Sequence, residues 1–187
     1  MDKIIITAAI TGAATVPSQS PYIPITPEQI SEEAVKAFDA GAAVAHIHAR
    51  NPYDGRPSSS LDYYRKIVTD IKKRCNVVIC ITTGAGAGMS VDERTAPIRM
   101  FKPELGSLNL GSMNFSMHPL LKKIKEWKFD WEQQYLENSR DFIFPNSFAS
   151  LEKITAIMRE NETKPELEVY DTSHLYNAKY LIDQGLM

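Results

Sequence analysis

The chain has few of the features that mark disulfide-bonded, nucleic-acid-binding or membrane-bound proteins. Its 187 residues include only two cysteines, Cys75 and Cys80, which form no C-x-x-C pair. Neither a disulfide framework nor a cysteine-rich metal motif is therefore predicted. The 21 basic and 23 acidic residues give a net charge of -2. This balance offers no electrostatic attraction to nucleic acid or to an anionic membrane.

Long hydrophobic runs are also missing. No segment reaches the length of a membrane span, and the N-terminus lacks the charged region, apolar stretch and cleavage site of a signal peptide. We therefore expect a cytoplasmic protein in which both cysteines are small core residues. The length suits one domain spanning 1–187.

What the chain does contain is a regular alternation of strand and helix patterns. Apolar segments bounded by turn residues predict strands at 3–9, 42–48, 76–82, 105–110 and 165–171. Helices are predicted at 27–40, 60–74, 92–100 and 173–184, the first opened by the capping sequence Thr26-Pro27-Glu28-Gln29. Apolar strands separated by helices indicate a parallel sheet covered by helices, an α/β fold with about five β/α units.

The interval between the fourth and fifth predicted strands is longer than the others. It begins with a loop and a helix of uncertain extent, and it contains the aromatic sequence Trp127-Lys128-Phe129-Asp130-Trp131. We interpret the segment at about 127–146 as an insertion that packs aromatic residues on the surface or against a partner.

The most informative motif is His46-Ile47-His48, which closes an apolar strand. Residues two apart in a strand point to the same side, so both imidazoles leave the sheet together at its C-terminal end. Two histidines at that spacing can share one divalent metal, most naturally zinc. The alternative is that both are ordinary polar residues at the end of a strand.

Polar or small residues follow every predicted strand, where parallel β/α folds gather their chemistry. They include Thr82 and Gly84 after the third strand, Ser107 and Asn109 on the fourth, and Glu168 on the fifth. Leu167 and Val169 flank Glu168, so its carboxylate is expected to face inward, where it is costly unless it serves charge or metal chemistry.

Other candidate residues have simpler explanations. The glycine loop 84–88 lacks the spacing of a dinucleotide-binding fingerprint, so its amides are expected to approach a small anion instead. His118 and His174 could serve as metal ligands, or they could be capping or solvated residues at helix starts.

Several of these segments together resemble the β-keto acid cleavage enzymes, whose type member acts in lysine fermentation. The similarity runs from residue 3 to near the end of the chain, and it is carried by the segments 5–13, 24–28, 41–50, 55–58, 81–84, 107–115 and 165–171.

The resemblance implies a TIM (β/α)8 barrel and a metal-dependent acyltransferase. Such an enzyme condenses a β-keto acid with acetyl-CoA and releases acetoacetate and a new acyl-CoA. The resemblance makes His46 and His48 metal ligands, usually for zinc. It also makes Glu168 a catalytic residue and assigns the keto-carboxylate end of the substrate to four further residues, Thr82, Gly84, Ser107 and Asn109. A homo-oligomer is expected.

Two departures from the family pattern qualify this expectation. Ala14 stands where the aminohexanoate enzyme has a glutamate that binds the substrate amine, so a neutral or different substrate side chain is expected. The family has about eight β/α units, and its third metal ligand, a glutamate, and its catalytic arginine–aspartate pair belong to units beyond the five predicted here. We therefore expect an N-terminal portion of such a barrel.

Two other functions remain open on the sequence. One is a partial barrel without catalytic activity that binds metal or a partner through its open edge. The other is a zinc hydrolase of the amidohydrolase kind, which also uses a His-x-His pair but requires further histidine ligands downstream.

Overall fold

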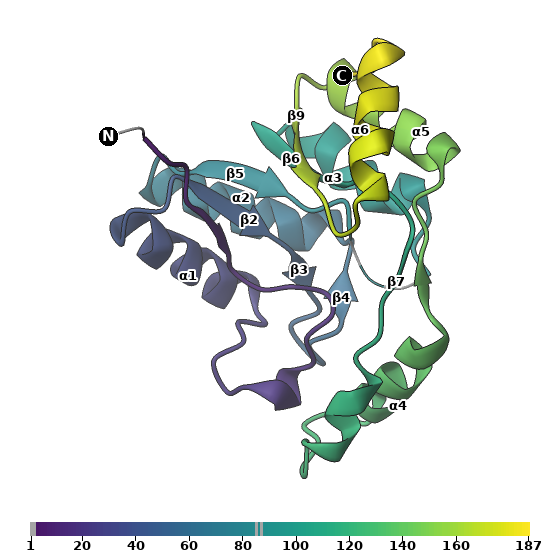
Figure 1. Cartoon of the computed structure of the whole chain (residues 1–187). Helices are drawn as coiled ribbons and strands as arrows, with labels where there is room; N and C mark the ends of the chain where they lie inside the picture. The colour runs from purple at the N-terminus through teal and green to yellow at the C-terminus, as the bar shows by residue number, and fades with distance from the viewer. Residues whose placement is uncertain (1–2, 85, 87) are drawn as a thin grey trace.

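The centre of the molecule is a parallel sheet of five strands (Figure 1). The structure, a computed structural model, describes residues 3–84, 86 and 88–187. The strand order is β1-β2-β5-β6-β9, and every neighbouring pair is parallel. The strands are β1 Thr7–Ala9, β2 Val44–Ile47, β5 Val78–Ile81, β6 Leu105–Asn109 and β9 Lys164–Glu168. The predicted parallel α/β architecture is confirmed.

Helices cover the outer face of this sheet. Successive helices pack against one another: α1 (Pro27–Asp39) contacts α2 (Leu61–Arg74), α2 contacts α3 (Val91–Phe101), and α3 contacts α5 (Phe148–Glu160). The last helix, α6 (Ser173–Asp183), comes after β9 in the sequence. The predicted cap of α1 is present, because Thr26 and Gln29 exchange side-chain-to-backbone hydrogen bonds. No helix among the described residues is both long and apolar enough to cross a lipid bilayer.

The two faces of the sheet differ in chemistry because successive strand residues point to opposite sides. Ile47, Ile79, Ile81 and Leu108 point toward the helices and join the apolar core. Their neighbours on the other face are polar or ionisable; they include His46, Thr82, Asn109, Glu166 and Glu168. One face therefore stabilises the fold, and the other holds the chemistry.

The sheet is curled so strongly that its two outermost strands meet across the inner face. The hydroxyl of Thr7 on β1 donates a hydrogen bond of 3.0 Å to the carboxylate of Glu166 on β9. A flat sheet would separate these strands by about four inter-strand spacings, or about 19 Å. The contact thus shows a curled half-barrel, consistent with part of a TIM barrel.

Two small hairpins extend from the strand ends. β3 (Ala49–Arg50) pairs with β4 (Pro57–Ser58), and β7 (Met113–Asn114) pairs with β8 (Ile143–Phe144). The β7–β8 pair forms an arm that carries the 3-10 turns η2 (His118–Lys122) and η3 (Ser139–Asp141) and the helix α4 (Trp131–Asn138) (Figure 1). A third 3-10 turn, η1 (Pro17–Gln19), lies in the loop after β1.

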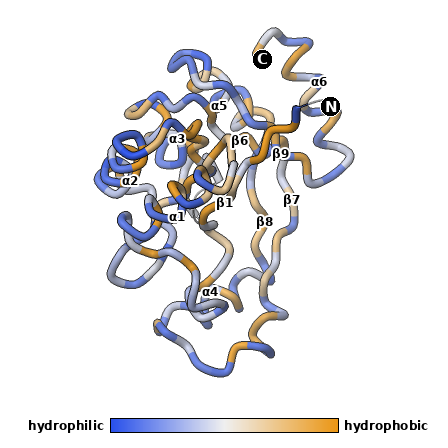
Figure 2. The backbone as a smooth tube through the Cα atoms, turned by 90° about the vertical axis from the view of Figure 1, so that its left-hand side faces the viewer, coloured by the Kyte–Doolittle hydropathy of each residue, from blue (hydrophilic) through white to orange (hydrophobic). Residues whose placement is uncertain are grey.

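Some predicted boundaries were wrong. The first strand begins at Thr7 rather than residue 3, because the ladder with β2 starts at the Thr7–Val44 pair. Ile4 and Ile5 before it remain exposed, and Figure 2 shows this segment in the hydrophobic colour. The fifth strand ends at Glu168 rather than residue 171. The single helix expected after the fourth strand is in fact two helices, α4 and α5.

Candidate active site

A cavity of about 690 Å³ lies on the inner face of the sheet, at the C-terminal ends of the strands. Six of the seven predicted site residues line it: His46, His48, Thr82, Gly84, Asn109 and Glu168. The seventh, Ser107, is buried beside the cavity, where its hydroxyl accepts a hydrogen bond from the backbone amide of Thr83. Strand alternation thus brings most of the predicted set together.

The two histidines of the His-x-His motif lie side by side in the cavity. Their Nε2 atoms are 3.0 Å apart, and their ring centroids are 5.0 Å apart. Burial, together with the nearby His46 and Arg50, lowers the pKa of His48 well below its usual value, so its imidazole is neutral at neutral pH. A neutral imidazole has the free lone pair that a metal requires.

The donor geometry fits a shared divalent metal. Two imidazole nitrogens bound tetrahedrally to one zinc ion at about 2.0–2.1 Å would be about 3.3 Å apart. The observed 3.0 Å between the Nε2 atoms is close to that separation. His46 is on β2, whose neighbours β1 and β5 fix its backbone, and His48 follows directly after the last residue of that strand, so the pair is arranged before any metal binds.

Glu166 is a site residue that the sequence analysis missed. It lies on the same face of β9 as Glu168, and its carboxylate is 3.7 Å from Nδ1 of His46. The thiol of Cys80 also donates to this carboxylate over 3.2 Å. One ligand atom from each of His46, Cys80 and Glu166 lies within 4.8 Å of the other two, so these residues could also hold a metal.

Glu168 lies further toward the cavity mouth. Its carboxylate accepts a hydrogen bond of 3.3 Å from the hydroxyl of Tyr170. Burial, and then the charge of Glu168, raise the pKa of Tyr170, so the phenol stays protonated and donates to the carboxylate. The carboxylate faces the cavity as the sequence predicted, and it is available to a bound molecule.

Polar residues at the ends of β5 and β6 line one side of the cavity. The hydroxyl of Thr82 accepts from the amide of Gly84 over 2.9 Å, and Asn109 accepts from the amide of Gly111 over 3.4 Å. A methyl group on Gly84 would contact the ring of Phe144 at 3.7 Å. Of the predicted anion loop 84–88, residues 85 and 87 lie outside the described residues, and that prediction stays open.

A buried arginine fixes the loop after β1, which forms another wall of the cavity. The Arg50 guanidinium donates to the carbonyl oxygens of Gly12, Thr15 and Gly55 and to the hydroxyls of Thr11 and Thr15. Burial lowers its pKa to about 10, which still leaves it charged at neutral pH. Sequence reasoning missed this buried position, because burial of an arginine depends on tertiary contacts.

A second buried arginine holds the opposite wall. Arg94 on α3 donates to the carbonyl oxygens of Thr83 and Pro145 and to the side chain of Asn146, and it lies over the ring of Phe144. It therefore ties the loop after β5 to the β8 strand of the arm. Sequence reasoning missed this contact for the same reason.

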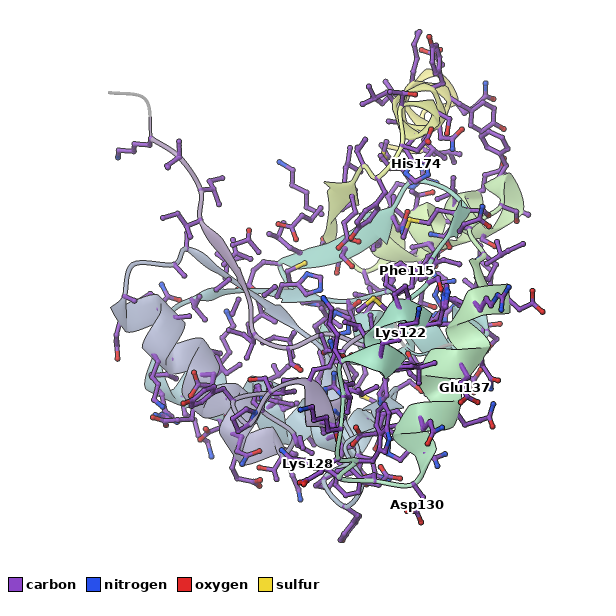
Figure 3. All side chains as sticks on the ribbon, turned by 60° about the horizontal axis from the view of Figure 1, so that its bottom comes forward. Phe115, Lys122, Lys128, Asp130, Glu137 and His174 are labelled. Carbon is purple, nitrogen blue, oxygen red and sulfur yellow. The ribbon has the colours of Figure 1, made fainter. Side chains whose placement is uncertain are left out.

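The arm closes the remaining side of the cavity. Tyr135 on α4 lines the cavity and donates to the carbonyl oxygen of Ala13 over 3.0 Å. Trp131 donates to the carbonyl oxygen of Asp54 over 2.8 Å. Figure 3 shows the labelled Lys128, Asp130 and Glu137 around this helix. The aromatic segment at 127–146 thus packs partly against the loops of its own chain.

The two remaining histidines do not join the pair. His118 on η2 contacts the hydroxyl of Ser116 through Nδ1, and His174 is buried at the start of α6, where Nδ1 accepts from the amide of Tyr170. Neither lines the cavity. The described residues therefore lack the additional histidine ligands that the amidohydrolase interpretation requires.

A curled parallel sheet with a polar site at its strand ends is consistent with part of an α/β barrel fold. The chain matches the family described as beta-keto acid cleavage enzyme over residues 3–187, and it belongs to that family. The resemblance seen in the sequence is therefore confirmed.

Curated relatives show the range of chemistry within this family. The chain is 48% identical over 184 residues to the 3,5-dioxohexanoate:acetyl-CoA acetone transferase of Paraburkholderia graminis, covering 98% of this chain and 59% of the relative. It is 36% identical over 186 residues to the 3-keto-5-aminohexanoate cleavage enzyme of Acetoanaerobium sticklandii, covering 99% of this chain and 59% of the relative. The chain thus spans about 60% of these relatives' length.

Solved structures agree with this assignment. The complex of ObcA with oxaloacetate superposes with a TM-score of 0.58 at 27% identity, covering 89% of this chain and 35% of that chain. The complex of ObcA with a C4-CoA adduct and oxalate gives a TM-score of 0.56 at 26% identity, covering 89% and 35% respectively.

Proposed function

We propose that this chain supplies the metal-binding and substrate-binding part of a β-keto acid cleavage enzyme. The reaction condenses a β-keto acid with acetyl-CoA and releases acetoacetate and a new acyl-CoA. The observation that carries the proposal is the His46–His48 pair, with Nε2 atoms 3.0 Å apart, in a cavity shared with Thr82, Asn109 and Glu168. We further propose a full (β/α)8 barrel, zinc as the metal, a homo-oligomer and a cytoplasmic location.

Each part of the site has a chemical role in this proposal. His46 and His48 would hold the metal, which when bound would supply Lewis-acid polarisation of the keto oxygen of the substrate. The Thr82 hydroxyl and the Asn109 amide orient the keto-carboxylate end by hydrogen bonds. Glu168 lies where it can hold or move a proton at the reacting carbon. Gly84 and Ser107 are proposed at the same end of the substrate, and the Ser107 hydroxyl also supports the loop at Thr83.

The walls around Ala14 indicate a substrate with a neutral side chain. Ala13 and Ala14 line the cavity and carry no charge, and the arm adds apolar side chains from Met113, Phe115, Met117 and Phe142. Ala14 itself offers no carboxylate to a cationic substrate side chain, which would lose hydration against these apolar residues. We therefore propose a neutral acyl chain on the β-keto acid.

The activity is tested in a chimera, because the family's third metal ligand and its arginine–aspartate pair are expected outside these residues. Residues 1–187 are joined to the C-terminal units of the Paraburkholderia relative, and CoA products are measured by mass spectrometry with acetyl-CoA and neutral β-keto acids. We expect acetoacetate and a new acyl-CoA, and loss of both in His48→Ala. A folded, zinc-loaded chimera that forms neither product would contradict the proposal.

Substrate choice is tested in the same chimera. Ala14→Glu places a carboxylate in the cavity wall, and we expect it to raise kcat/KM for an amino-substituted β-keto acid and to lower it for a neutral one. Ala14→Gln, of similar size but without charge, is the matched control. An unchanged preference in Ala14→Glu would show that this wall does not contact the substrate side chain.

A further inference from the structure

We propose that Glu166 is a positioning residue that fixes the tautomer and orientation of His46. In this arrangement the Glu166 carboxylate holds a proton on Nδ1 of His46, which leaves the Nε2 lone pair free beside His48. The link to a metal rests on the proposed function, whereas the tautomer is a property of this chain alone.

The carboxylate is anchored from both sides of the strand that carries His46. Its Oε1 atom accepts from the Thr7 hydroxyl over 3.0 Å, and its Oε2 atom accepts from the Cys80 thiol over 3.2 Å. Thr7 is on β1 and Cys80 is on β5, the two strands that flank β2 in the sheet. Glu166 reaches this position from β9 because the sheet curls. Alternate strands of a barrel contribute such an interior layer.

This anchoring holds the carboxylate close to one particular ring nitrogen. Oε2 of Glu166 is 3.7 Å from Nδ1 of His46, while Nε2 of the same ring is 3.0 Å from His48. A closure of about 0.5–1 Å would form an N–H···O hydrogen bond. His46 is only 8% exposed, so water competes little for Nδ1. Carboxylates commonly occupy this place behind metal-binding histidines.

The charge of Glu166 selects one tautomer. A carboxylate accepts but does not donate, so Nδ1 of a neutral His46 must carry the proton and Nε2 must be the acceptor. Without metal, the 3.0 Å contact then requires His48 to donate its Nε2 proton to His46. If both Nε2 atoms are to bind a metal, the proton of His48 would have to move from Nε2 to Nδ1 by exchange with solvent, which leaves one free Nε2 lone pair on each neutral ring.

A different arrangement of the same residues is that Cys80 and Glu166 bind a metal directly with His46. The hydrogen bond from the Cys80 thiol to Glu166 favours the positioning role, because a thiol that donates still holds its proton. A metal ligand would have to be the thiolate.

The first test is the tautomer of His46 in the metal-free chain, read from ¹⁵N chemical shifts of the imidazole nitrogens. We expect Nδ1–H for His46 and Nε2–H for His48. Glu166→Ala should remove this preference in His46, whereas Glu166→Gln should retain it because its amide oxygen can still accept. Glu168→Gln, on the same face of the same strand, should leave both tautomers unchanged. An Nε2–H tautomer of His46 in the unsubstituted chain would overturn the proposal.

The second test uses Co²⁺ as a probe of the ligands. We expect an absorption spectrum without a thiolate-to-cobalt charge-transfer band, and a Kd about 10–100-fold weaker in Glu166→Ala. A strong charge-transfer band that disappears in Cys80→Ser would overturn the proposal in favour of direct ligation. If the chain takes up no cobalt, the metal part of the proposed function fails, and the tautomer measurement still decides the role of Glu166.

Discussion

The guanidinium of Arg50 donates twice to Thr15, to its carbonyl oxygen over 2.8 Å and to its hydroxyl over 3.0 Å. Thr15 ends the cavity-lining part of the loop after β1. Arg50 lies two residues beyond His48, so the histidine pair and the loop that faces it are built from one stretch of chain. The position of Ala14 in the cavity wall therefore depends on a side chain that does not itself line the cavity.

Replacing Arg50 should be costly to stability. Arg50→Met leaves the carbonyl oxygens of Gly12, Thr15 and Gly55 without this donor, and we expect the free energy of unfolding to fall by about 2–4 kcal/mol. Urea denaturation followed by circular dichroism measures the change. Arg65→Met removes only an exposed pair with Asp62 and should cost less than about 1 kcal/mol. Equal losses in the two variants would argue against the role given to Arg50.

Gly106 on β6 marks a close approach of the sheet to its helices. A Cβ atom there would lie 2.9 Å from Met158, 3.0 Å from Ile98 and 3.1 Å from Thr163. We expect Gly106→Ala to destabilise the chain by about 1–3 kcal/mol through overpacking. Gly12→Ala is the control, because its Cβ would meet only Thr15 at 4.0 Å. A thermal midpoint unchanged in Gly106→Ala would show that the helices can move outward freely.

The contact between α1 and α2 should weaken in acid. The Ser31 hydroxyl donates to Asp70 over 2.7 Å, and this hydrogen bond, followed by that from Arg74, lowers the pKa of Asp70 below 3.8. A carboxyl whose pKa is lowered by folding adds stability above its unfolded pKa, and this stability is lost as the pH falls through its folded pKa. We expect the urea concentration at the unfolding midpoint to decrease once the pH falls below about 4.

The same midpoints measured for Asp70→Asn test this assignment. The difference between the two proteins should be largest at pH 7 and should shrink as the pH falls below about 3.9, because the unfolded chain then takes up the proton before the folded one. Asp62→Asn is a suitable control, since Asp62 is an exposed carboxyl on the same helix that pairs only with Arg65 among the described residues. A difference that is the same at both pH values would mean that Asp70 does not contribute through its charge.

The parts of the fold that depend on local sequence patterns were predictable. The two-residue period placed His46, His48, Thr82 and Asn109 on one face, and the cap at Thr26 fixed the start of α1. The arm was harder, because its strands are only two residues long and carry no periodic pattern. The 127–146 insertion remains a prediction about the family, although its contacts are now described.

The residues that sequence reasoning missed depend on long-range geometry. Glu166 and Glu168 are two residues apart and therefore share one face of β9. Only the curl of the sheet, however, brings Glu166 to Thr7 and Cys80. Arg50 and Arg94 occur beside loops, where an arginine is usually solvated. Their burial follows from packing between segments that are far apart in the sequence.

The most direct test of the central claim is the zinc content of the chain. The purified protein is dialysed to equilibrium against zinc, and metal and mass are measured together with the size in solution. The account predicts one zinc ion per chain, lost in His46→Ala and in His48→Ala and kept in His118→Ala. A folded chain that binds no zinc, or that retains it in both His46→Ala and His48→Ala, would contradict the account.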